Sequence, residues 1–482
     1  MGTPTASVLR WTSALSLALC ACSTHYASPA MGVAGTPDPR VTVFRADRER
    51  SWSSFRLGGG LNVVVASRGL PREFAWRFPT GGISSSPTVI RTTILVSAND
   101  DHLYAIDAST GALRWRYHAE NEIMSQPAYA HGLVYVGIGN SENTAYDPPY
   151  FTVVGSGMNK LEAISANTGI EQWWSGLDGT GMPSPAVVGS NVIAVTGHGT
   201  VLAVDAKRGT FRWRRELETV FAMSSVVSDA DGRLYLCGRF QNAVFALNAN
   251  DGNILWTHTF DRLVGGVGDD PLASTPGAVI GDYLQPLRAG PFGMFVTYGS
   301  VAREHVYALD KRDGHLLWDR TLGAVQGVVP RYNESAIALV YGDRVYVGST
   351  VAPIVTALDA HSGRVVWQLH VGGPVKGGIA ARDGILYFGD LTGVLWAVDA
   401  RSGRAVGRVA TDMHFNVGSP IIVNDSLVDG GLEDVIALPL SNIRASQPMP
   451  GVTSLSLWQK IARGIASVVP HRDPHREAAY YR

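Results

Sequence analysis

Five charged residues could bind a charged ligand, because they lie at or just before segments that otherwise begin with small or neutral residues. They are Lys376, Arg331, Glu334, Asp269 and Asp270. Two cations and three carboxylates gathered in one place could bind an anionic cofactor or a Ca²⁺ ion. The simpler interpretation, and the one we expect, is a solvated rim of polar side chains.

Residues 139–151 offer a second set of oxygen ligands. Asn140, Glu142 and Asp147 carry amide and carboxylate oxygens of the kind that a hard cation prefers. The same segment contains Pro148-Pro149 and several aromatic residues, and long loops of this kind often bind partners. We therefore expect a partner-binding loop here rather than a metal site.

The sequence carries none of the short motifs that mark common catalytic sites. It has no Gly-x-Ser-x-Gly turn, no Walker loop and no His-Glu-x-x-His pair. Its 13 histidines are scattered without the spacing of metal ligands. The net charge of −1, with no long block of Lys and Arg, argues against a nucleic-acid partner.

Residues 1–22 have the layout of an export signal. One arginine precedes an apolar stretch that is too short to span a bilayer. Ala21-Cys22 resembles a bacterial lipobox, so Cys22 is the predicted lipidation site; the alternative is a plain signal cleaved near Ala27 or Ala30. Residues 23–50, rich in Ser, Pro, Gly and charge, are predicted to form a flexible tether. In either case we expect the protein to work outside the cytoplasm.

One string recurs seven times in the rest of the chain, and its first copy runs Tyr104-Ala-Ile-Asp107…Gly111…Trp115. The alternating stretch predicts a half-buried strand, the Asp and Gly a tight hairpin, and the Trp a returning strand. We expect each indole ring to fill the gap between adjacent sheets, with the recurring alanine leaving room for it. The tryptophans predicted to dock in this way are Trp76, Trp115, Trp173, Trp213, Trp256, Trp318 and Trp367, and in the last copy Gly407 replaces the tryptophan.

A second recurring signal indicates the number of units. Eight segments that start with Ser, Pro, Gly or similar residues, from Ser85-Ser86-Pro87 to Gly418-Ser419-Pro420, each lead into an apolar strand. Each unit then holds four strands, which is the content of one propeller blade. We predict an all-β fold over residues 51–440, an eight-bladed β-propeller of four-stranded antiparallel blades. Either Leu61–Val65 or Glu73–Trp76 is expected to complete the last blade and so leave no open sheet edge.

Insertions and a tail extend this pattern. Residues 139–160 and 265–295 lengthen the second and fifth units, and both are expected to be surface loops that bind partners. Residues 441–482 form a C-terminal tail with apolar residues near helical spacing from Ser454 to Val469. We expect this tail to dock on the propeller, with a membrane surface as the alternative.

The Ala-x-Asp-x-x-x-Gly-x-x-x-Trp string resembles the tryptophan-docking repeat of pyrroloquinoline quinone (PQQ) propellers, over roughly residues 75–440. Within that superfamily the chain is more similar to the non-catalytic lipoproteins like BamB, which supports β-barrel assembly at the bacterial outer membrane, than to the PQQ-dependent alcohol dehydrogenases. The dehydrogenases hold their quinone with a disulfide of adjacent cysteines, Ca²⁺ carboxylates and a catalytic Asp in a Trp-Asp-x-Asp run. Here Cys20, Cys22 and Cys237 include no adjacent pair, and Trp318-Asp319-Arg320 stops short of that run.

The resemblance implies a non-catalytic, exported scaffold lipoprotein that holds envelope proteins through its propeller loops. We expect a monomer anchored to a membrane by its lipid, without PQQ, Ca²⁺ or nucleic acid. The alternative is a PQQ-dependent dehydrogenase, or a degenerate relative that still binds the quinone. In that case Lys376, Arg331, Glu334, Asp269 and Asp270 are the first residues to test for contact with the cofactor.

Overall fold

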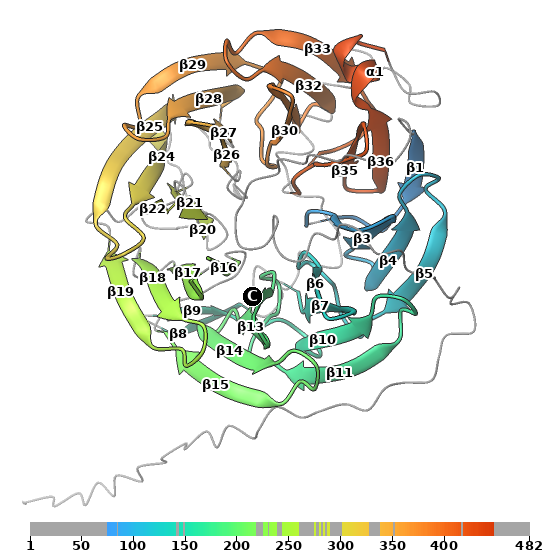
Figure 1. Ribbon diagram of the computed structural model, residues 1–482, viewed down its shortest axis with the longest axis vertical. Helices are drawn as coiled ribbons and strands as arrows, with labels where there is room; N and C mark the ends of the chain where they lie inside the picture. Colours follow the sequence, from blue (N-terminus) through green and yellow to red (C-terminus); the bar gives the residue numbers. More distant parts are fainter. Residues whose placement is uncertain are drawn as a thin grey trace, which may run out of the picture.

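The computed structural model describes residues 75–447, apart from positions 84, 141–143, 148–149, 218–224, 230, 239–242, 260–273, 276–278, 281–282, 285–286, 290–300, 327–337, 350–351 and 416–417. The described strands form eight four-stranded antiparallel sheets and two short hairpins. The eight sheets stand as blades around a central axis (Figure 1). The protein is an eight-bladed β-propeller, as predicted from the repeats.

Each blade runs from an inner strand near the axis to an outer strand at the perimeter. From the inner to the outer strand, blade 1 consists of β2 (Thr88–Ile90), β3 (Thr93–Ser97), β4 (His102–Asp107) and β5 (Leu113–His118), and blade 2 of β6 (Ala128–Ala130), β7 (Leu133–Ile138), β10 (Lys160–Ser165) and β11 (Glu171–Gly176). Blade 3 consists of β12 (Ala186–Val188), β13 (Asn191–Val195), β14 (Thr200–Asp205) and β15 (Phe211–Glu216), and blade 4 of β16 (Val227–Ser228), β17 (Arg233–Gly238), β18 (Ala243–Asn248) and β19 (Ile254–Thr259). In the same order, blade 5 consists of β20 (Ser274–Thr275), β23 (Leu287–Ala289), β24 (Val301–Leu309) and β25 (Leu316–Gln326), and blade 6 of β26 (Leu339–Tyr341), β27 (Arg344–Gly348), β28 (Ile354–Asp359) and β29 (Val365–His370). Blade 7 consists of β30 (Ala380–Arg382), β31 (Ile385–Gly389), β32 (Val394–Asp399) and β33 (Ala405–Ala410), and blade 8 of β34 (Ile421–Val423), β35 (Ser426–Gly430), β36 (Asp434–Pro439) and β1 (Trp76–Pro79). The insertions in blades 2 and 5 contain the hairpins β8 (Thr144–Asp147) with β9 (Tyr150–Val153) and β21 (Val279–Ile280) with β22 (Tyr283–Leu284).

The ring closes through β1, the first described strand, which completes blade 8. It pairs antiparallel with β36, so that Trp76 lies opposite Ala437. Arg77 strengthens the closure with ion pairs to Asp412, at 2.8 Å, and to Asp434. The closing strand therefore begins at Trp76, the last residue of the predicted segment Glu73–Trp76.

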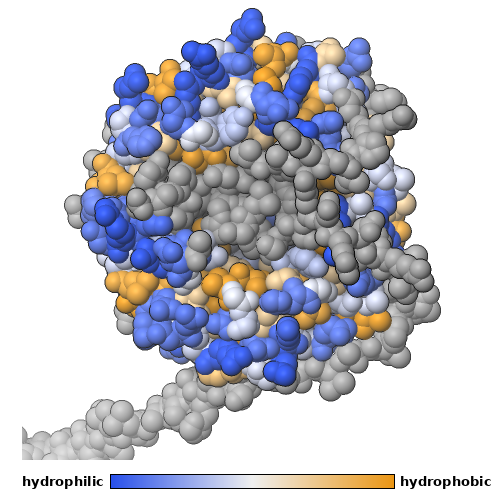
Figure 2. Space-filling view, in the orientation of Figure 1, coloured by the Kyte–Doolittle hydropathy of each residue, from blue (hydrophilic) through white to orange (hydrophobic). Residues whose placement is uncertain are grey.

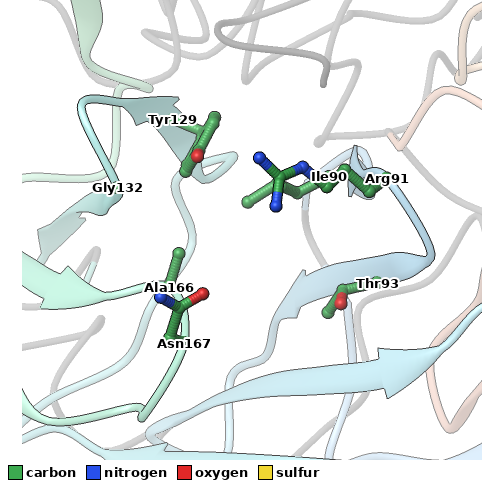
Figure 3. A pocket seen from close by; sticks show the side chains of 7 residues that line it. All are labelled: Ile90, Arg91, Thr93, Tyr129, Gly132, Ala166 and Asn167. Carbon is green, nitrogen blue, oxygen red and sulfur yellow. The ribbon is translucent and has the colours of Figure 1, made fainter. Parts of the chain in front are cut away.

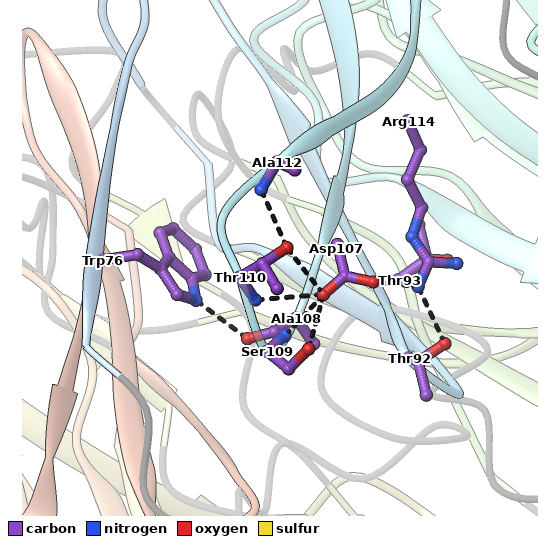
Figure 4. Close-up of polar contacts among 9 residues, drawn as sticks. All are labelled: Trp76, Thr92, Thr93, Asp107, Ala108, Ser109, Thr110, Ala112 and Arg114. Carbon is purple, nitrogen blue, oxygen red and sulfur yellow. Dashed lines mark hydrogen bonds and ion pairs between the residues drawn. The ribbon is translucent and has the colours of Figure 1, made fainter.

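Seven tryptophans join successive blades in the same way. The indole Nε1 of each donates to a backbone carbonyl of the next blade, at 2.8–3.3 Å: Trp76 to Ala108, Trp115 to Ala166, Trp173 to Ala206, Trp213 to Ala249, Trp256 to Lys311, Trp318 to Ala360 and Trp367 to Ala400. Figure 4 shows the first of these contacts beside the turn of blade 1. Buried aliphatic residues of both blades surround each ring, so the core of the protein lies in the gaps between blades.

The glycine of the repeat makes room for the neighbouring ring. A Cβ atom built on Gly169 would come within 2.7 Å of the Trp115 ring, and the φ of this glycine is +70°. The recurring alanine instead lies opposite the tryptophan of its own blade, as Ala163 does with Trp173. A small side chain at this place leaves room for the indole on the adjacent strand, as expected from the sequence.

The aspartate of the repeat organises the turn that receives the indole. Asp107 Oδ1 accepts hydrogen bonds from the backbone N–H groups of Ser109, at 2.9 Å, and Thr110, at 3.0 Å. Burial alone would raise the pKa of Asp107, but hydrogen bonds from Ser109, Arg114 and Thr110 lower it to about 2. The carboxylate is therefore ionised at neutral pH and holds the turn closed.

The junction between blades 7 and 8 is built differently. Helix α1 (Leu440–Arg444) packs against β33, and a side chain at Gly407 would overlap the backbone of Ile443 and Arg444. Ile443 is fully buried, and Arg444 Nε donates to the hydroxyl of Tyr387 at 2.6 Å. The helix thus occupies the place of the missing tryptophan. In the part of the chain that the structure describes, no helix is long and apolar enough to cross a membrane.

Candidate functional site

The starts of the inner strands form a hydrogen-bonded belt around the axis. Backbone N–H groups donate to serine hydroxyls of the next blade at four places: Gly378 to Ser419 (3.1 Å), Ser419 to Ser86 (2.8 Å), Gln126 to Ser184 (2.8 Å) and Ser184 to Ser225 (3.0 Å). The recurring serines seen in the sequence therefore hold neighbouring blades at a fixed spacing. This inner belt is a structural feature, and these hydroxyls are already engaged.

Lys376 lies next to the inner belt, just before β30, and it is only 5% exposed. A buried ammonium group at this place is engaged within the protein rather than standing free in the channel. Arg331, Glu334, Asp269 and Asp270 fall outside the described residues, as does Cys22. The grouping of the five charged residues therefore stays a prediction.

Two residues compared above with those of the dehydrogenases do not supply their quinone-binding features. Asp319, the acid of the shortened Trp-Asp run, lies on β25, which is the outermost strand of blade 5 and not a channel-lining strand. Cys237 lies on β17 opposite Val244, with no neighbouring cysteine.

Asn140 anchors the blade 2 insertion and is not free to bind a cation. Its Nδ2 donates to Asn121 Oδ1 at 3.1 Å and to the Ser156 hydroxyl at 2.8 Å, and its Oδ1 accepts from the Ser156 N–H at 2.8 Å. Asp147 is the last residue of β8, and Glu142 lies outside the described residues. The proposed set of three oxygen ligands is therefore reduced to two candidates.

Among the described residues, one group has the spacing of metal ligands, namely Asp310, Asp313 and His315. Arg312 already pairs with Asp310 at 2.6 Å, and His315 pairs with Asp313 at 2.7 Å. Asp310 and Asp313 accept hydrogen bonds from backbone N–H groups of the turn between β24 and β25. Because their carboxylates are engaged in this turn, we do not assign a metal site to this group.

A buried carboxyl group lies where blade 1 meets blade 2. Glu162 is 1% exposed, and its Oε2 has no hydrogen-bond partner among the described atoms. Lys160 Nζ lies 3.9 Å from Glu162 Oε1 but only 2.6 Å from Glu120 Oε2, and the Tyr117 hydroxyl donates to Glu171 at 3.0 Å. Burial raises the pKa of Glu162 to about 7, against the opposing effect of Tyr117 and Lys160.

The repeat contains a signal for this group that sequence reasoning missed. At the position of Glu162, the other copies carry mostly large apolar or aromatic residues: Tyr104, Leu202, Phe245, Tyr307, Thr356 and Trp396. An acid at a position that is buried in every other blade predicts a perturbed carboxyl group.

We expect Glu162→Gln to stabilise the protein in a pH-dependent way. A folded-state pKa of about 7 lies above the unfolded value, so the wild type loses stability as the pH rises between the two values. The glutamine variant should unfold like the wild type near pH 4 and gain roughly 2–3 kcal/mol by pH 8. Urea unfolding at both pH values measures this difference, and an equal difference at both would contradict the assignment.

The outer strands of blades 3 to 6 carry exposed apolar side chains. Phe211, Ile254, Leu255, Leu316, Leu317 and Val365, here called the apolar rim, are 38–48% exposed and lie at the starts of β15, β19, β25 and β29. Apolar surface interrupts the hydrophilic outer edge on the side where blades 4 and 5 lie, at the left of Figure 2. Each of these strands pairs with only one described neighbour, so each leaves backbone N–H and C=O groups at its free edge.

The family model described as outer membrane protein assembly factor BamB matches residues 38–149, 149–266 and 302–444. These segments cover more than half of the chain and contain all seven docking tryptophans. The chain belongs to the BamB family. The unmatched residues between the last two segments include the inner strands β20 and β23 of blade 5 and the hairpin of β21 with β22, so the BamB match covers most of the propeller.

Proteins with different names are similar to this chain. The tetrathionate hydrolase of Acidithiobacillus ferrooxidans is 25% identical over 378 residues, which cover 75% of this chain and 74% of that protein. BamB of Yersinia pestis is 23% identical over 349 residues, covering 70% of this chain and 79% of that protein. The crystal structure of BamB from Moraxella catarrhalis matches with a TM-score of 0.56 and 17% identity, over 77% of this chain and all of that one. The function of this chain must therefore be argued from its own residues.

Proposed function

We propose that this protein is a non-catalytic scaffold of the cell envelope, which holds extended segments of outer membrane proteins during their assembly. Cys22 would carry the lipid that keeps it at the membrane, with the propeller facing the periplasm. Membership of the BamB family supports the assembly role.

The apolar rim is the observation that carries this proposal. Four successive blades present apolar side chains beside free strand edges, whereas blade 2 has Glu171 at the same position. An extended segment with alternating apolar residues can pair with such an edge through its backbone and bury its side chains against the rim. Strands of outer membrane barrels have this alternation.

The double variant Leu255→Ser with Leu317→Ser tests the rim. Both side chains are more than 40% exposed, so their replacement should leave folding intact. We expect binding of a fluorescent ten-residue peptide of alternating apolar and polar residues to weaken at least about tenfold, because each leucine contributes roughly 1.5 kcal/mol or more when it is buried. Fluorescence anisotropy with the full-length protein measures the affinity.

Leu113→Ser provides a matched control. Leu113 is the first residue of the outer strand of blade 1, one position before the equivalents of the two substituted leucines, and it is 45% exposed, but its neighbour in blade 2 is the polar Glu171. This variant should bind the peptide like the wild type. A wild type that does not bind, or a double variant that binds equally well, would overturn the proposal.

A second candidate function is the hydrolysis of tetrathionate, favoured by the similarity to a tetrathionate hydrolase over 75% of this chain. Consumption of tetrathionate by the purified protein tests it directly. Dye-linked alcohol oxidation with added PQQ and Ca²⁺ tests the dehydrogenase alternative in the same series. Turnover in either assay would replace the non-catalytic proposal.

A further inference from the structure

A small pocket opens between the hairpin turns of blades 1 and 2. It has a volume of about 200 Å³ and is lined by Ile90, Arg91, Thr93, Tyr129, Gly132, Ala166 and Asn167. The guanidinium group of Arg91 points from blade 1 across the pocket, and Tyr129 and Asn167 stand on the opposite side (Figure 3). None of the residues that line the pocket belongs to the apolar rim.

Arg91 has an unusual backbone conformation for its residue type. Its φ is +56°, in the left-handed region that favours glycine, asparagine and aspartate. In four other blades the equivalent position of this hairpin turn also has a positive φ, and residues that adopt it more readily occupy it, namely Gly189, Gly342, Asp383 and Asn424. A disfavoured arginine at this place suggests that its side chain has a use, since strained residues gather at binding sites.

The polar groups of the pocket are available to a ligand. The side chains of Arg91, Tyr129 and Asn167 form no hydrogen bond or ion pair with any residue that the structure describes. Thr93 Oγ1 accepts a hydrogen bond from Arg114 at 3.1 Å, which leaves the hydroxyl proton of Thr93 free to be donated. Four side chains can therefore donate hydrogen bonds into one space, and one of them is a cation.

The walls of the pocket are held in place by the blade junction. The Ala166 N–H donates to the Gly132 carbonyl at 3.0 Å, and the Ala166 carbonyl accepts from Trp115 at 3.1 Å. On the other side, Arg114 bonds to Thr92 at 3.0 Å and braces the turn that carries Arg91. The pocket is thus formed before a ligand arrives, which lowers the entropic cost of binding.

From this geometry we infer that the pocket is a binding site for a small carboxylate. A carboxylate accepts hydrogen bonds and donates none, and it matches the planar guanidinium in a two-bonded pair. Arg91 is the only charged side chain in the lining, so one negative charge is balanced, whereas a dianion such as sulfate would keep one charge unmatched. Ile90 and Ala166 add apolar walls for a short carbon chain. The carboxylate belongs either to a free small acid or to the C-terminus of a polypeptide.

Calorimetric titration of the full-length protein separates these sources. The probes are an acetylated Ala-Gly-Val peptide with a free C-terminus, the same peptide amidated, sodium acetate and sodium tetrathionate. We expect the free-acid peptide to bind at least about tenfold more tightly than the amidated one. Acetate that binds as well as the peptide would assign the site to free acids, and weaker acetate binding would assign it to polypeptide C-termini.

Arg91→Asn tests the residue itself. Asparagine tolerates the left-handed conformation, so this variant should keep or raise the melting temperature while it weakens carboxylate binding at least about tenfold. Asp383→Asn is the matched control, because Asp383 has a φ of +50° in the equivalent turn of blade 7, away from the pocket. Its affinity should equal that of the wild type.

Four results would overturn the inference. These are no saturable binding of either carboxylate probe, equal binding of the amidated peptide, unchanged affinity in the folded Arg91→Asn variant, or tighter binding of tetrathionate than of both carboxylates. The last result would identify a site for sulfur oxyanions instead.

Discussion

Replacing Trp115 with alanine should lower the free energy of unfolding by about 3–5 kcal/mol, the range for removing a buried aromatic side chain. Trp115 is 1% exposed, its Nε1 bonds to Ala166, and its ring lies on Gly169 of the next blade. The substitution removes the ring and leaves the Ala166 carbonyl without its donor, so a cavity and an unpaired acceptor arise together. Urea unfolding, followed by intrinsic fluorescence and circular dichroism, measures the loss.

Trp367→Ala is the comparison for this variant. Trp367 makes the equivalent hydrogen bond to Ala400 at 3.0 Å, but its ring is only partly buried. Its loss should be clearly smaller, because less apolar surface returns to water. Equal losses for the two variants, or a loss below about 1 kcal/mol for Trp115→Ala, would show that the indole rings do not hold the blades together.

Gly169→Ala should destabilise the protein by about 2–4 kcal/mol, although it adds only one methyl group. Part of the cost, about 1 kcal/mol, arises because alanine disfavours a φ of +70°. The rest arises because the new Cβ would lie 2.7 Å from the Trp115 ring, so the ring or the turn must move. The free energy of unfolding in urea gives the total effect.

Gly189→Ala separates these two contributions. Gly189 has a φ of +60°, and no atom lies within 4 Å of a Cβ built on it. It should therefore show only the backbone cost of about 1 kcal/mol. If both variants lose the same stability, the close approach of glycine and indole is not what limits this position.

The ring of blades could be predicted from the sequence because the same contacts between a turn, a glycine and an indole recur from blade to blade. The Asp107 turn, the glycine that follows it and the Trp115 ring recur together, and their common spacing indicates a stack of similar sheets. The count of eight came from the starts of the inner strands, which the structure explains as the inner belt. The contact between the glycine and the indole of the adjacent blade was missed, because which residue meets a neighbouring ring depends on the packing of two blades and not on one repeat.

The candidate sites were harder to predict, because they depend on exceptions to the repeat. Glu162 is notable only when its position is compared with the other copies, and Arg91 only when the φ of its turn is known. Helix α1 follows a blade that lacks the usual turn, and nothing in its five residues alone points to the Gly407 gap. Lys376 was singled out for its charge, and the structure places it in a buried position.

The closure of the ring through β1 has a consequence for biogenesis. Arg77 and Asp434 lie 357 positions apart in the chain, yet they must meet before blade 8 exists. A nascent chain whose synthesis has not yet reached β36 keeps β1 unpaired, and contacts this distant in sequence form slowly. Late folding of this kind exposes apolar blade surfaces to chaperones and proteases. A premature stop codon shortly before β36 should therefore remove the whole protein from the cell, and not merely its last blade.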